Sequence, residues 1–518
     1  MTERAALPDL DKLNPKELKA LIISQHELIT SRDNEIEQLK LLIAKLRRMQ
    51  FGRKSEKLER QIEQLELRLE ALQLNDAETV AALPKPMANV AGVARPARRP
   101  LPTHLPREVR THLPKQEACP DCGGELRKLG EDVSEILERI PAHLYVIRHV
   151  RVKLACANCD KIVQAEAPSR PIERGMAGPG LLAHVLVSKY GDHLPLYRQS
   201  EIYAREGVEL DRATLADWVG QTGRLFEPLV GVLRRHVMSA GKLHADDIPV
   251  PVLAPGLGKT KIGRLWTYVR DDRPSGDATP PAVWFAYTPD RRGEHPRAHL
   301  EKFTGTLQAD GYAGFDQIYE AGKIQEAACW AHARRKFYDI QVAHKSAVAT
   351  EALERIGALY AIETEIRGRS PEERRAVRNE RSRPLLESLK RWLEETLIKL
   401  SKKSDTAMAV RYALGRWEAL MRYCDDGRLE IDNNAAERSL RAVALGRKNY
   451  LFAGSDRGGE SAAAMYSLIG TAKLNGIDPE GYLRDILSRI AEHPINRIEE
   501  LLPWNLTPAP AESSSRAA

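Results

Sequence analysis

The sequence predicts a multidomain α+β protein, and three observations support this fold class. Apolar, β-branched runs that begin at Leu243 first follow one another closely and then alternate with helical patterns, which is the order expected of a mixed α/β sheet. Apolar residues at heptad spacing recur through residues 13–75, which predicts long helices. Two CxxC pairs lie between these regions and predict a small module stabilised by a metal.

Composition sets the number of domains and the kind of partner. The chain has 518 residues, 42% of them hydrophobic, which is enough for two to four domains with apolar cores. The formal net charge is +7, but residues 85–117 hold seven Lys or Arg against two acids, and residues 366–403 hold twelve against six. Such clusters suit a polyanion such as DNA, and a solvated charged face is the alternative.

The chain shows no sign of membrane insertion or export. No apolar run of about 18 residues predicts a membrane span. The N-terminus is charged and lacks the apolar core of a secretory signal. Four of six cysteines fall in CxxC pairs, which indicates a metal in a reducing compartment. We therefore expect a cytoplasmic protein without a membrane partner.

The N-terminal region, residues 13–75, is predicted to be a coiled coil. Ile22, Ile29, Ile36 and Ile43 are seven residues apart, and a second series alternates spacings of four and three through Leu58, Ile62, Leu65, Leu69 and Leu72. This pattern predicts a homo-oligomer, a dimer or higher, and a helical hairpin folded back within one chain is the alternative. Residues 84–117 are rich in Pro, Ala and Arg without periodicity, which predicts a basic linker.

Residues 118–168 are predicted to form a zinc-binding module. Each CxxC places two thiolates on one tight turn, and two such turns complete a tetrahedral site for structural Zn²⁺. The residues between the pairs include a strand-like run, HLYVIRHVRVKLA, which a zinc ribbon can accommodate. A redox dithiol is the alternative, but no thioredoxin-like pattern surrounds the motif. The four expected ligands are Cys119, Cys122, Cys156 and Cys159.

Residues 176–236 have the outline of a helix-turn-helix unit that binds DNA. The pattern is a helix, a turn at Gly207, an N-cap at Asp211 and a second helix. Arg212 and Thr214 fall on the exposed face of the second helix, where they would contact DNA. A helix pair with a purely structural role is the alternative. The expected core residues are Leu196, Val208, Leu210, Leu215 and Trp218.

Three acidic residues in polar settings predict a site for two Mg²⁺ or Mn²⁺ ions. Asp246 and Asp310 end strand-like runs, and Glu437 begins a helix after an Asn-rich turn. Hard cations prefer oxygen ligands, and a pair of them can clamp a phosphodiester. Successive side chains of a strand point to opposite faces, so only one of Asp246 and Asp247 can reach the metals, and Asp246 is expected. Ordinary surface carboxylates are the alternative.

Arginines accompany the third acid. Arg438 and Arg441 follow Glu437 on helical spacing. One helical turn separates Glu437 from Arg441, so a carboxylate for metal and a cation for phosphate would lie side by side.

Long motifs spread over residues 36–490 resemble the insertion-sequence-66 family of bacterial transposases. The resemblance rests on LHADD, LQADGYAGF, EAACWAHARRKF, DNNAAERSLR, GRKNYLFAGSDRGGESAAAMYSLIGTAKLNG, FGRKSEKL and the CxxC pairs. It implies a DDE-type catalytic domain with a ribonuclease-H-like fold at residues 240–475, interrupted by a helical insertion at about 347–424 and followed by a helical segment at 476–504. The family usually has Asp-Glu-Thr at the first acid, whereas this chain has Ile248 in the third position.

The resemblance also assigns roles to further residues. It implies that the zinc module binds DNA, and Arg148, His149 and Arg151 would fit that role. It matches Cys329 and His332 to a CxxH element of the family. We expect this element to be either a packed structural pair or a histidine that forms a hydrogen bond or orients the substrate.

The activity implied is metal-dependent cleavage at the ends of an insertion sequence, followed by attack of the freed 3′-hydroxyl on target DNA. The partners would be the terminal inverted repeats, target DNA and accessory proteins of the element, in the bacterial cytoplasm and at the nucleoid when bound to DNA. Two other functions remain as alternatives. One is a DNA-binding regulator with an inactive catalytic fold, and the other is a structure-specific nuclease that never joins strands.

Overall fold

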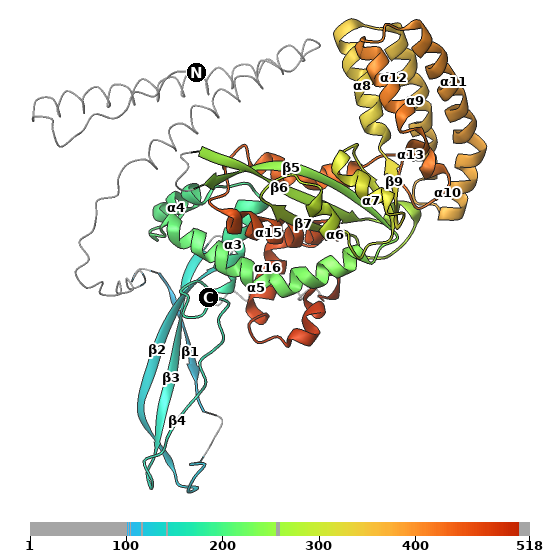
Figure 1. Cartoon of the computed structure of the whole chain (residues 1–518). Helices are drawn as coiled ribbons and strands as arrows, with labels where there is room; N and C mark the ends of the chain where they lie inside the picture. Colours follow the sequence, from blue (N-terminus) through green and yellow to red (C-terminus); the bar gives the residue numbers. More distant parts are fainter. Residues whose placement is uncertain are drawn as a thin grey trace, which may run out of the picture. The chain divides into compact units, whose positions relative to one another are not determined.

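The computed structural model describes residues 101, 103, 105–114, 118–140, 143–254 and 259–506 (Figure 1). Its centre is a five-stranded sheet in the order β7-β6-β5-β8-β9. β6 and β7 are antiparallel, whereas β8 runs parallel to both β5 and β9. The strand-like runs predicted from Leu243 onward are confirmed. The strands are β5 Lys242–Ala254, β6 Lys259–Arg270, β7 Ala282–Thr288, β8 Gly305–Ala309 and β9 Ile324–Ala328.

Helices cover the edge of the sheet at β7, which fits the nearly continuous apolar sequence of this strand. β7 is buried along almost its whole length. Its outer edge is covered by α15 (Asp456–Leu474), and this helix supplies hydroxyl groups in place of a further strand. Phe285 N donates to Ser467 Oγ at 2.8 Å, and Val283 N donates to Thr471 Oγ1 at 3.1 Å. The edge therefore offers few free backbone groups to another chain.

The predicted helix-turn-helix unit consists of α3 (Pro179–Tyr190), α4 (Leu196–Arg205) and α5 (Arg212–Met238). Gly207 has φ of +82°, as the turn requires. Asp211 stands at the N-cap of α5 without a capping hydrogen bond from its side chain. All five expected core residues are buried. However, α5 is 27 residues long, and it packs its later residues into the core of the sheet, so the unit has no core of its own.

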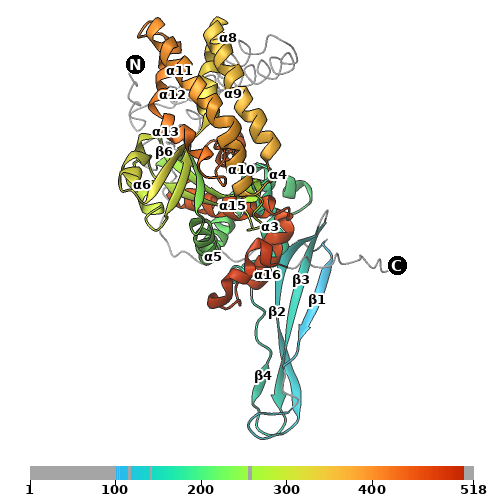
Figure 2. The same cartoon turned by 90° about the vertical axis from the view of Figure 1, so that its right-hand side faces the viewer.

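The cysteine-bearing module is a long β-ribbon (Figure 2). Its strands are ordered β1-β3-β2, with β4 paired to β3. Where the ribbon meets the helices, Leu137 and Val146 join the same core as α3, and Leu181 N donates to Glu138 Oε1 at 2.7 Å. The strands are β1 Arg107–His112, β2 Leu126–Ile140, β3 His143–Cys156 and β4 Ile162–Gln164.

One sequence prediction is wrong at this ribbon. The linker predicted at residues 84–117 contains β1, which pairs in parallel with β3. The strand was missed because its sequence, REVRTH, is largely exposed at the edge of the sheet and shows no alternation of apolar and polar residues. The rest of that linker, apart from residues 101, 103, 105–106 and 113–114, and the predicted coiled coil at residues 13–75 lie outside the described residues.

The helical insertion has an apolar core of its own, to which α8 (Trp330–His344) contributes. Figures 1 and 2 both show α8, α9, α11 and α12 side by side. The region expected at about 347–424 is helical throughout its described length apart from short connections. Its helices are α9 Ala347–Ile366, α10 Pro371–Val377, the π-helix Arg378–Ser382, α11 Arg383–Lys399, α12 Asp405–Gly415 and α13 Trp417–Met421, followed by a 3₁₀ turn at Arg422–Cys424.

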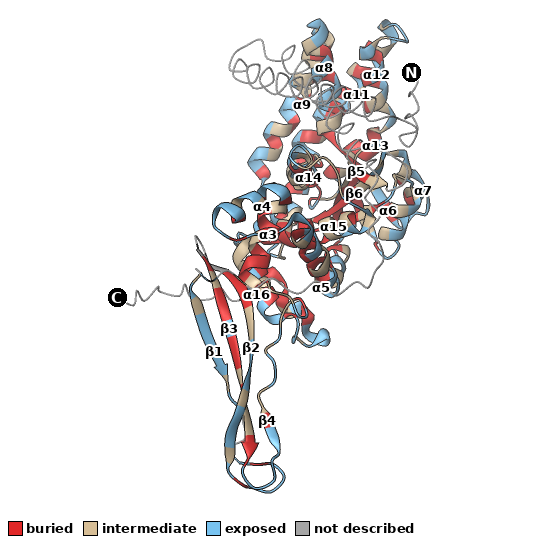
Figure 3. Cartoon of the chain, turned by 90° about the vertical axis from the view of Figure 1, so that its left-hand side faces the viewer, coloured by how far each residue is buried: buried red, intermediate tan, exposed pale blue. Residues whose placement is uncertain are grey.

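Short elements complete the fold, and Figure 3 shows buried residues concentrated around β5, β6 and α15. Among the described residues, no helix is both long and apolar enough to cross a membrane. The remaining helices are α6 Glu294–His299, α7 Asp316–Glu320, α14 Asn434–Gly446 and α16 Pro479–Arg489, with 3₁₀ turns at Arg273–Ser275, Ala313–Phe315, Ile495–Leu501 and Pro503–Asn505.

A buried ion-pair network fastens the insertion to the chain that leads into α14. Arg378 is fully buried and donates to both carboxylate oxygens of Glu363, at 2.8 and 2.6 Å. It also donates to the carbonyl oxygen of Leu429 at 2.9 Å. Arg374, which is also buried, donates to Glu430 at 2.7 Å. Arg374 and Arg378 can stay charged in the interior because each is paired with a carboxylate. Removal of either carboxylate would leave a buried charge without its partner.

We expect Glu363→Gln to lower the free energy of unfolding by about 3 to 5 kcal/mol, because it strands the buried charge of Arg378. Urea unfolding followed by circular dichroism measures this loss. Glu365→Gln is the matched control on the same helix, since Glu365 pairs with Arg381 in the solvent. The control should unfold like the unchanged protein, and equal losses in both variants would contradict the role given to the network.

Candidate functional site

Two of the three predicted acids lie side by side because of the register of the sheet. β5 and β8 are parallel neighbours, and His244 is opposite Gln308. Asp246 and Asp310 each stand two residues beyond that pair, so both point to the same face of adjacent strands, which lie about 4.8 Å apart. Tyr312 N donates to Asp310 Oδ1 at 3.2 Å and holds that carboxylate at the end of β8.

Glu437 lies in the first turn of α14, and buried amide side chains hold the start of this helix against the sheet. Asn433 is fully buried, and its Nδ2 donates to the carbonyl oxygen of Ala245 at 2.9 Å. Its Oδ1 lies 3.1 Å from His244 Nδ1. Gln308 bonds both backbone groups of Glu430, accepting from the N–H at 2.9 Å and donating to the carbonyl at 2.7 Å. The chain before α14 is thereby tied to β5 and β8.

The acids affect one another electrostatically. Burial, together with the negative charges of Asp310, Asp247 and Glu437, raises the pKa of Asp246 to about 7, although the hydrogen bond from Asp247 N opposes the shift. A carboxyl group in this position holds a proton near neutral pH unless a cation replaces it. The negative charges of Asp310 and Glu437 therefore act on Asp246, and carboxylate oxygens such as these are the ligands that hard divalent cations prefer.

Asp247 points the other way and is already neutralised. Its side chain is only 2% exposed and pairs with Arg264 at 3.0 Å and Arg291 at 2.8 Å. Asp246 therefore lies near the other two predicted acids, whereas Asp247 links β5 to β6 and to the loop after β7 through its ion pairs. No local sequence pattern predicts these two arginine partners, since they lie in other elements.

Two of these acids, Asp246 and Glu437, open onto a cleft of about 600 Å³, here called the acid cleft. Asp246, Ile248 and Glu437 line it together with Arg438 and Arg441. Both arginines are exposed, and neither forms an ion pair within the described part of the chain. Two cations that have no carboxylate partner suit a phosphate group.

His332 also reaches this cluster, on α8 one turn beyond Cys329. Its Nδ1 lies 3.9 Å from Glu437 Oε1 and has no hydrogen-bond partner among the described residues. Cys329 is buried, and burial raises its pKa to about 12, so it stays a thiol. Its Sγ accepts a hydrogen bond from Asn433 N at 3.1 Å. His332 thus faces Glu437, and Cys329 lies beside both, since the ligand atoms of Cys329, His332 and Glu437 lie within 4.8 Å of one another.

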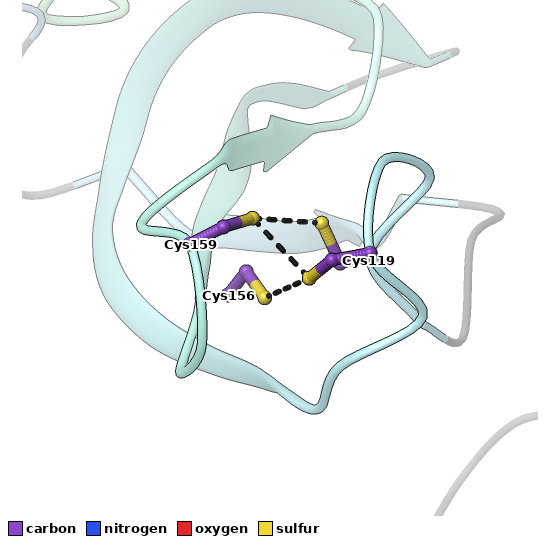
Figure 4. Close-up of side chains that lie close together, drawn as sticks. Cys119, Cys156 and Cys159 are labelled. Atoms are coloured by element: carbon purple, nitrogen blue, oxygen red, sulfur yellow. Dashed lines mark hydrogen bonds between the residues drawn. The ribbon is translucent and has the colours of Figure 1, made fainter.

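The four predicted zinc ligands converge at the far end of the ribbon (Figure 4). Their sulfur atoms lie within 4.8 Å of one another, with Cys119–Cys159 and Cys122–Cys159 at 3.3 Å and Cys122–Cys156 at 3.4 Å. A disulfide is excluded at these distances. Tetrahedral Zn–S bonds of about 2.3 Å place sulfurs about 3.8 Å apart, so the cluster fits Zn²⁺ after a small expansion. Although burial opposes it, backbone hydrogen bonds from Asn158 and Cys159 lower the pKa of Cys156 to about 7, which favours the thiolate.

The residues expected to contact DNA differ in their accessibility. Arg148 and Arg212 are exposed, and Thr214 is half-buried. Arg151 is committed to a structural contact, because its guanidinium donates twice to the carbonyl oxygen of Ala165, at 2.8 and 2.6 Å. His149 is buried and stacks on His112 with ring centroids 5.3 Å apart, so the expectation that it contacts DNA is wrong.

Family models match most of the chain. A model described as "Transposase IS66 family" matches residues 174–461, and one for the "IS66 C-terminal element" matches residues 467–504. The "zinc-finger binding domain of transposase IS66" matches residues 116–160, and a model described as "Transposase C of IS166 homeodomain" matches residues 38–110.

Relatives of similar length occur in Sinorhizobium fredii (strain NBRC 101917 / NGR234). The chain is 44% identical to the uncharacterized protein y4hP, over 93% of this chain and 90% of that protein. It is 40% identical to the uncharacterized protein y4qI, over 92% of this chain and 90% of that protein.

Asp246 lies near other acids, whereas Asp247 is paired with arginines. We therefore expect removal of the two charges to change the stability of the protein in opposite directions. The pKa of Asp246 in the folded protein, about 7, exceeds its ordinary value of 3.8, so ionisation weakens folding as pH rises from about 4 to 7. At pH 8 without added divalent metal, we expect Asp246→Asn to raise the free energy of unfolding by a few kcal/mol, at about 1.4 kcal/mol per pKa unit. At pH 4 this gain should vanish.

Asp247→Asn is the matched control for that experiment. It leaves Arg264 and Arg291 without their carboxylate, so it should lower the free energy of unfolding by about 2 kcal/mol at pH 8. Urea unfolding at both pH values measures the two variants. A loss of stability in Asp246→Asn at pH 8 would show that Asp246 does not face the acid cluster.

Metal analysis tests the cysteine cluster separately. We expect about one tightly bound Zn²⁺ per chain, which Cys119→Ser should lose together with the fold of the ribbon's end. Cys424→Ser is the control, because Cys424 is buried in the helical insertion and takes no part in the cluster. Protein purified under reducing conditions without zinc, yet with the ribbon folded, would contradict the assignment.

Proposed function

The chain belongs to the IS66 transposase family, and we propose that it cuts DNA at the ends of its insertion sequence and joins the freed 3′-hydroxyl to target DNA. The observation that carries this proposal is that Asp246 and Glu437 line one open cleft, while Asp310 follows the strand next to Asp246 and its charge acts on Asp246. Nothing in a plain DNA-binding regulator requires carboxylates to be gathered against their mutual repulsion.

We propose that the central sheet is a ribonuclease-H-like core. The support is its mixed topology, with an antiparallel pair on one side of β5 and parallel strands on the other. The first two acids stand on its adjacent parallel strands, and the third arrives on a helix after the insertion. The domain would span residues 240–475, with the insertion at about 347–424 as a separate packing unit.

The chemistry follows from what each residue can do. Asp246, Asp310 and Glu437 would hold two Mg²⁺ or Mn²⁺ ions, which when bound stabilise the attacking and leaving oxygens of a phosphodiester. Asp246 would release its proton when it becomes a ligand, since its carboxyl group otherwise stays protonated near neutral pH. Arg438 and Arg441 would hold phosphates of the DNA strand. His332, facing Glu437, would orient that carboxylate or the phosphate beside it.

Recognition and assembly belong to the other parts of the chain. We propose that the zinc module, through Arg148, and the α4–α5 unit, through Arg212 and Thr214, contact the terminal inverted repeats. The heptads at residues 13–75 would pair subunits so that two ends are held together. Accessory proteins of the element could take part in this assembly.

Removal of single acids tests the catalytic proposal. Asp310→Asn and Glu437→Gln should each lower Mg²⁺-dependent cleavage of element-end DNA by about a thousandfold or more, because the bound metals supply several kcal/mol of transition-state stabilisation. A cleavage assay on labelled DNA carrying the element's own ends measures this loss, and a gel-shift assay should find end binding retained.

The control variant is Asp316→Asn, which removes an exposed carboxylate of α7 outside the acid cleft. It should cleave like the unchanged protein. Cleavage without joining in the unchanged protein would favour the nuclease alternative, and substantial cleavage by Asp310→Asn would overturn the site.

A further inference from the structure

A second and larger cleft, here called the aromatic cleft, lies beside the acid cleft. Its volume is about 740 Å³, and it is bordered by α5, by the end of β5 and by the segment between α14 and α15. None of the catalytic or zinc-binding roles proposed above uses it. The residues on which the argument rests are Lys189, Arg224, Val250, Tyr450, Phe452 and Arg457.

Lys189 is the most unusual group in this cleft. Its Nζ lies 4.0 Å from the ring centroid of Tyr450 and 5.3 Å from that of Tyr190. Loss of hydration lowers the pKa of Lys189 to about 8, and no carboxylate contributes to offset that loss. A cation withdrawn from water without an anionic partner is costly, and an incoming anion would relieve the cost.

Other cations add to this charge. Arg224 and Arg457 line the cleft, are exposed, and form no ion pair within the described residues. Arg447, which also lines it, uses one nitrogen to bond the carbonyl oxygen of Pro249 at 3.2 Å. Glu227 and Glu460 are the acids of the lining, so cations outnumber acids there. The N-terminus of α15, a helix of 19 residues capped by Ser455, faces the same cleft and favours an anion.

The rest of the wall is apolar and aromatic. Phe452 is half-buried, and Val250 and Pro251 lie on the same cleft. A cation-rich cleft with an aromatic wall matches how proteins hold single-stranded nucleic acid, because every base has a face that can stack on an aromatic ring. A free inorganic anion would use the cations but would leave this wall exposed.

The two clefts share their walls. β5 carries Asp246 and Ile248 into the acid cleft and Val250 into the aromatic cleft, and α14 carries Leu440 into the first and Val443 into the second. Four residues of strand span about 13 Å, which is a few nucleotides of a DNA strand. A strand whose phosphodiester lies at the acids would reach the aromatic cleft within that length.

We propose that the aromatic cleft receives an unpaired nucleotide of the DNA strand that enters the acid cleft. The base would stack on Phe452, and its phosphates would lie beside Lys189 and Arg457. The inference rests on the proposed function, because it is that function which brings a DNA strand to the acids.

Binding of defined DNA in the absence of cleavage tests this inference. The protein is the full chain carrying Asp310→Asn, and the probes are two fluorescent duplexes of one element end, identical except that one has a single mispaired thymidine near the cut site. Fluorescence anisotropy gives both affinities. We expect the mispaired duplex to bind about tenfold more tightly, since stacking of one base contributes that order of affinity.

Two further substitutions test whether the preference for the mispaired duplex depends on the aromatic cleft. Lys189→Gln and Phe452→Leu should each reduce the preference for the mispaired duplex to about twofold or less, while the affinity for the fully paired duplex changes little. Phe452→Leu keeps an apolar side chain, so it preserves folding better than alanine would. Lys302→Gln, an exposed lysine outside the cleft, is the control and should keep the preference.

Each result decides one question. A preference that survives both substitutions, or no preference in the Asp310→Asn protein, overturns the inference. A change in oligomeric mass with Lys189→Gln or Phe452→Leu, without any change in the preference, would show that a second copy of the chain covers the cleft and would also overturn it. If the parent chain with Asp310 intact fails to cleave while the preference depends on Lys189, then the proposed function is wrong and the nucleotide site stands.

Discussion

The structure of the acid cleft depends on buried amide side chains that join distant parts of the chain. Asn433 bonds the carbonyl oxygen of Ala245, 188 residues away, and Gln308 bonds both backbone groups of Glu430, 122 residues away. A buried amide that lost its partners would cost about 1 to 3 kcal/mol, so these contacts favour one position of α14. That position brings Glu437 toward two aspartates that repel it.

The helical insertion separates the second acid from the third in sequence and also supports the third in space. Its apolar core includes α8 and extends to Leu429 and Ile431, just before α14. The buried pairs of Arg374 and Arg378 with Glu430 and Glu363 reinforce the same connection. Because protein interiors are close-packed, a shift in the insertion would be transmitted to the start of α14 and therefore to the acid cleft. The insertion is therefore packed so that it supports the position of α14.

Much of this could be predicted from the sequence. Apolar strand runs, the turn at Gly207 and the CxxC pairs are local signals, and the structure follows them at each point. β1 was missed because an exposed edge strand has no apolar alternation, and the burial of His149 depends on a stacking partner, His112, from another strand. The partners of Asp247 and the contacts of Gln308 are long-range pairings of side chains, which no local pattern encodes. The roles of Asp246, Asp310 and Glu437 stay predictions, although the register of β5 and β8 gives a physical reason for the first two to meet.

The central claim is that Asp246, Asp310 and Glu437 form one site for divalent metal while Asp247 does not. Mn²⁺ binding to the zinc-loaded protein tests this metal site without requiring DNA or catalysis. The bound ions are measured by electron paramagnetic resonance at pH 8. We expect up to about two bound ions per chain in the unchanged protein, with binding lost or greatly weakened in Asp246→Asn and in Glu437→Gln but retained in Asp247→Asn. Equal Mn²⁺ binding by the unchanged protein, Asp246→Asn and Glu437→Gln would contradict it.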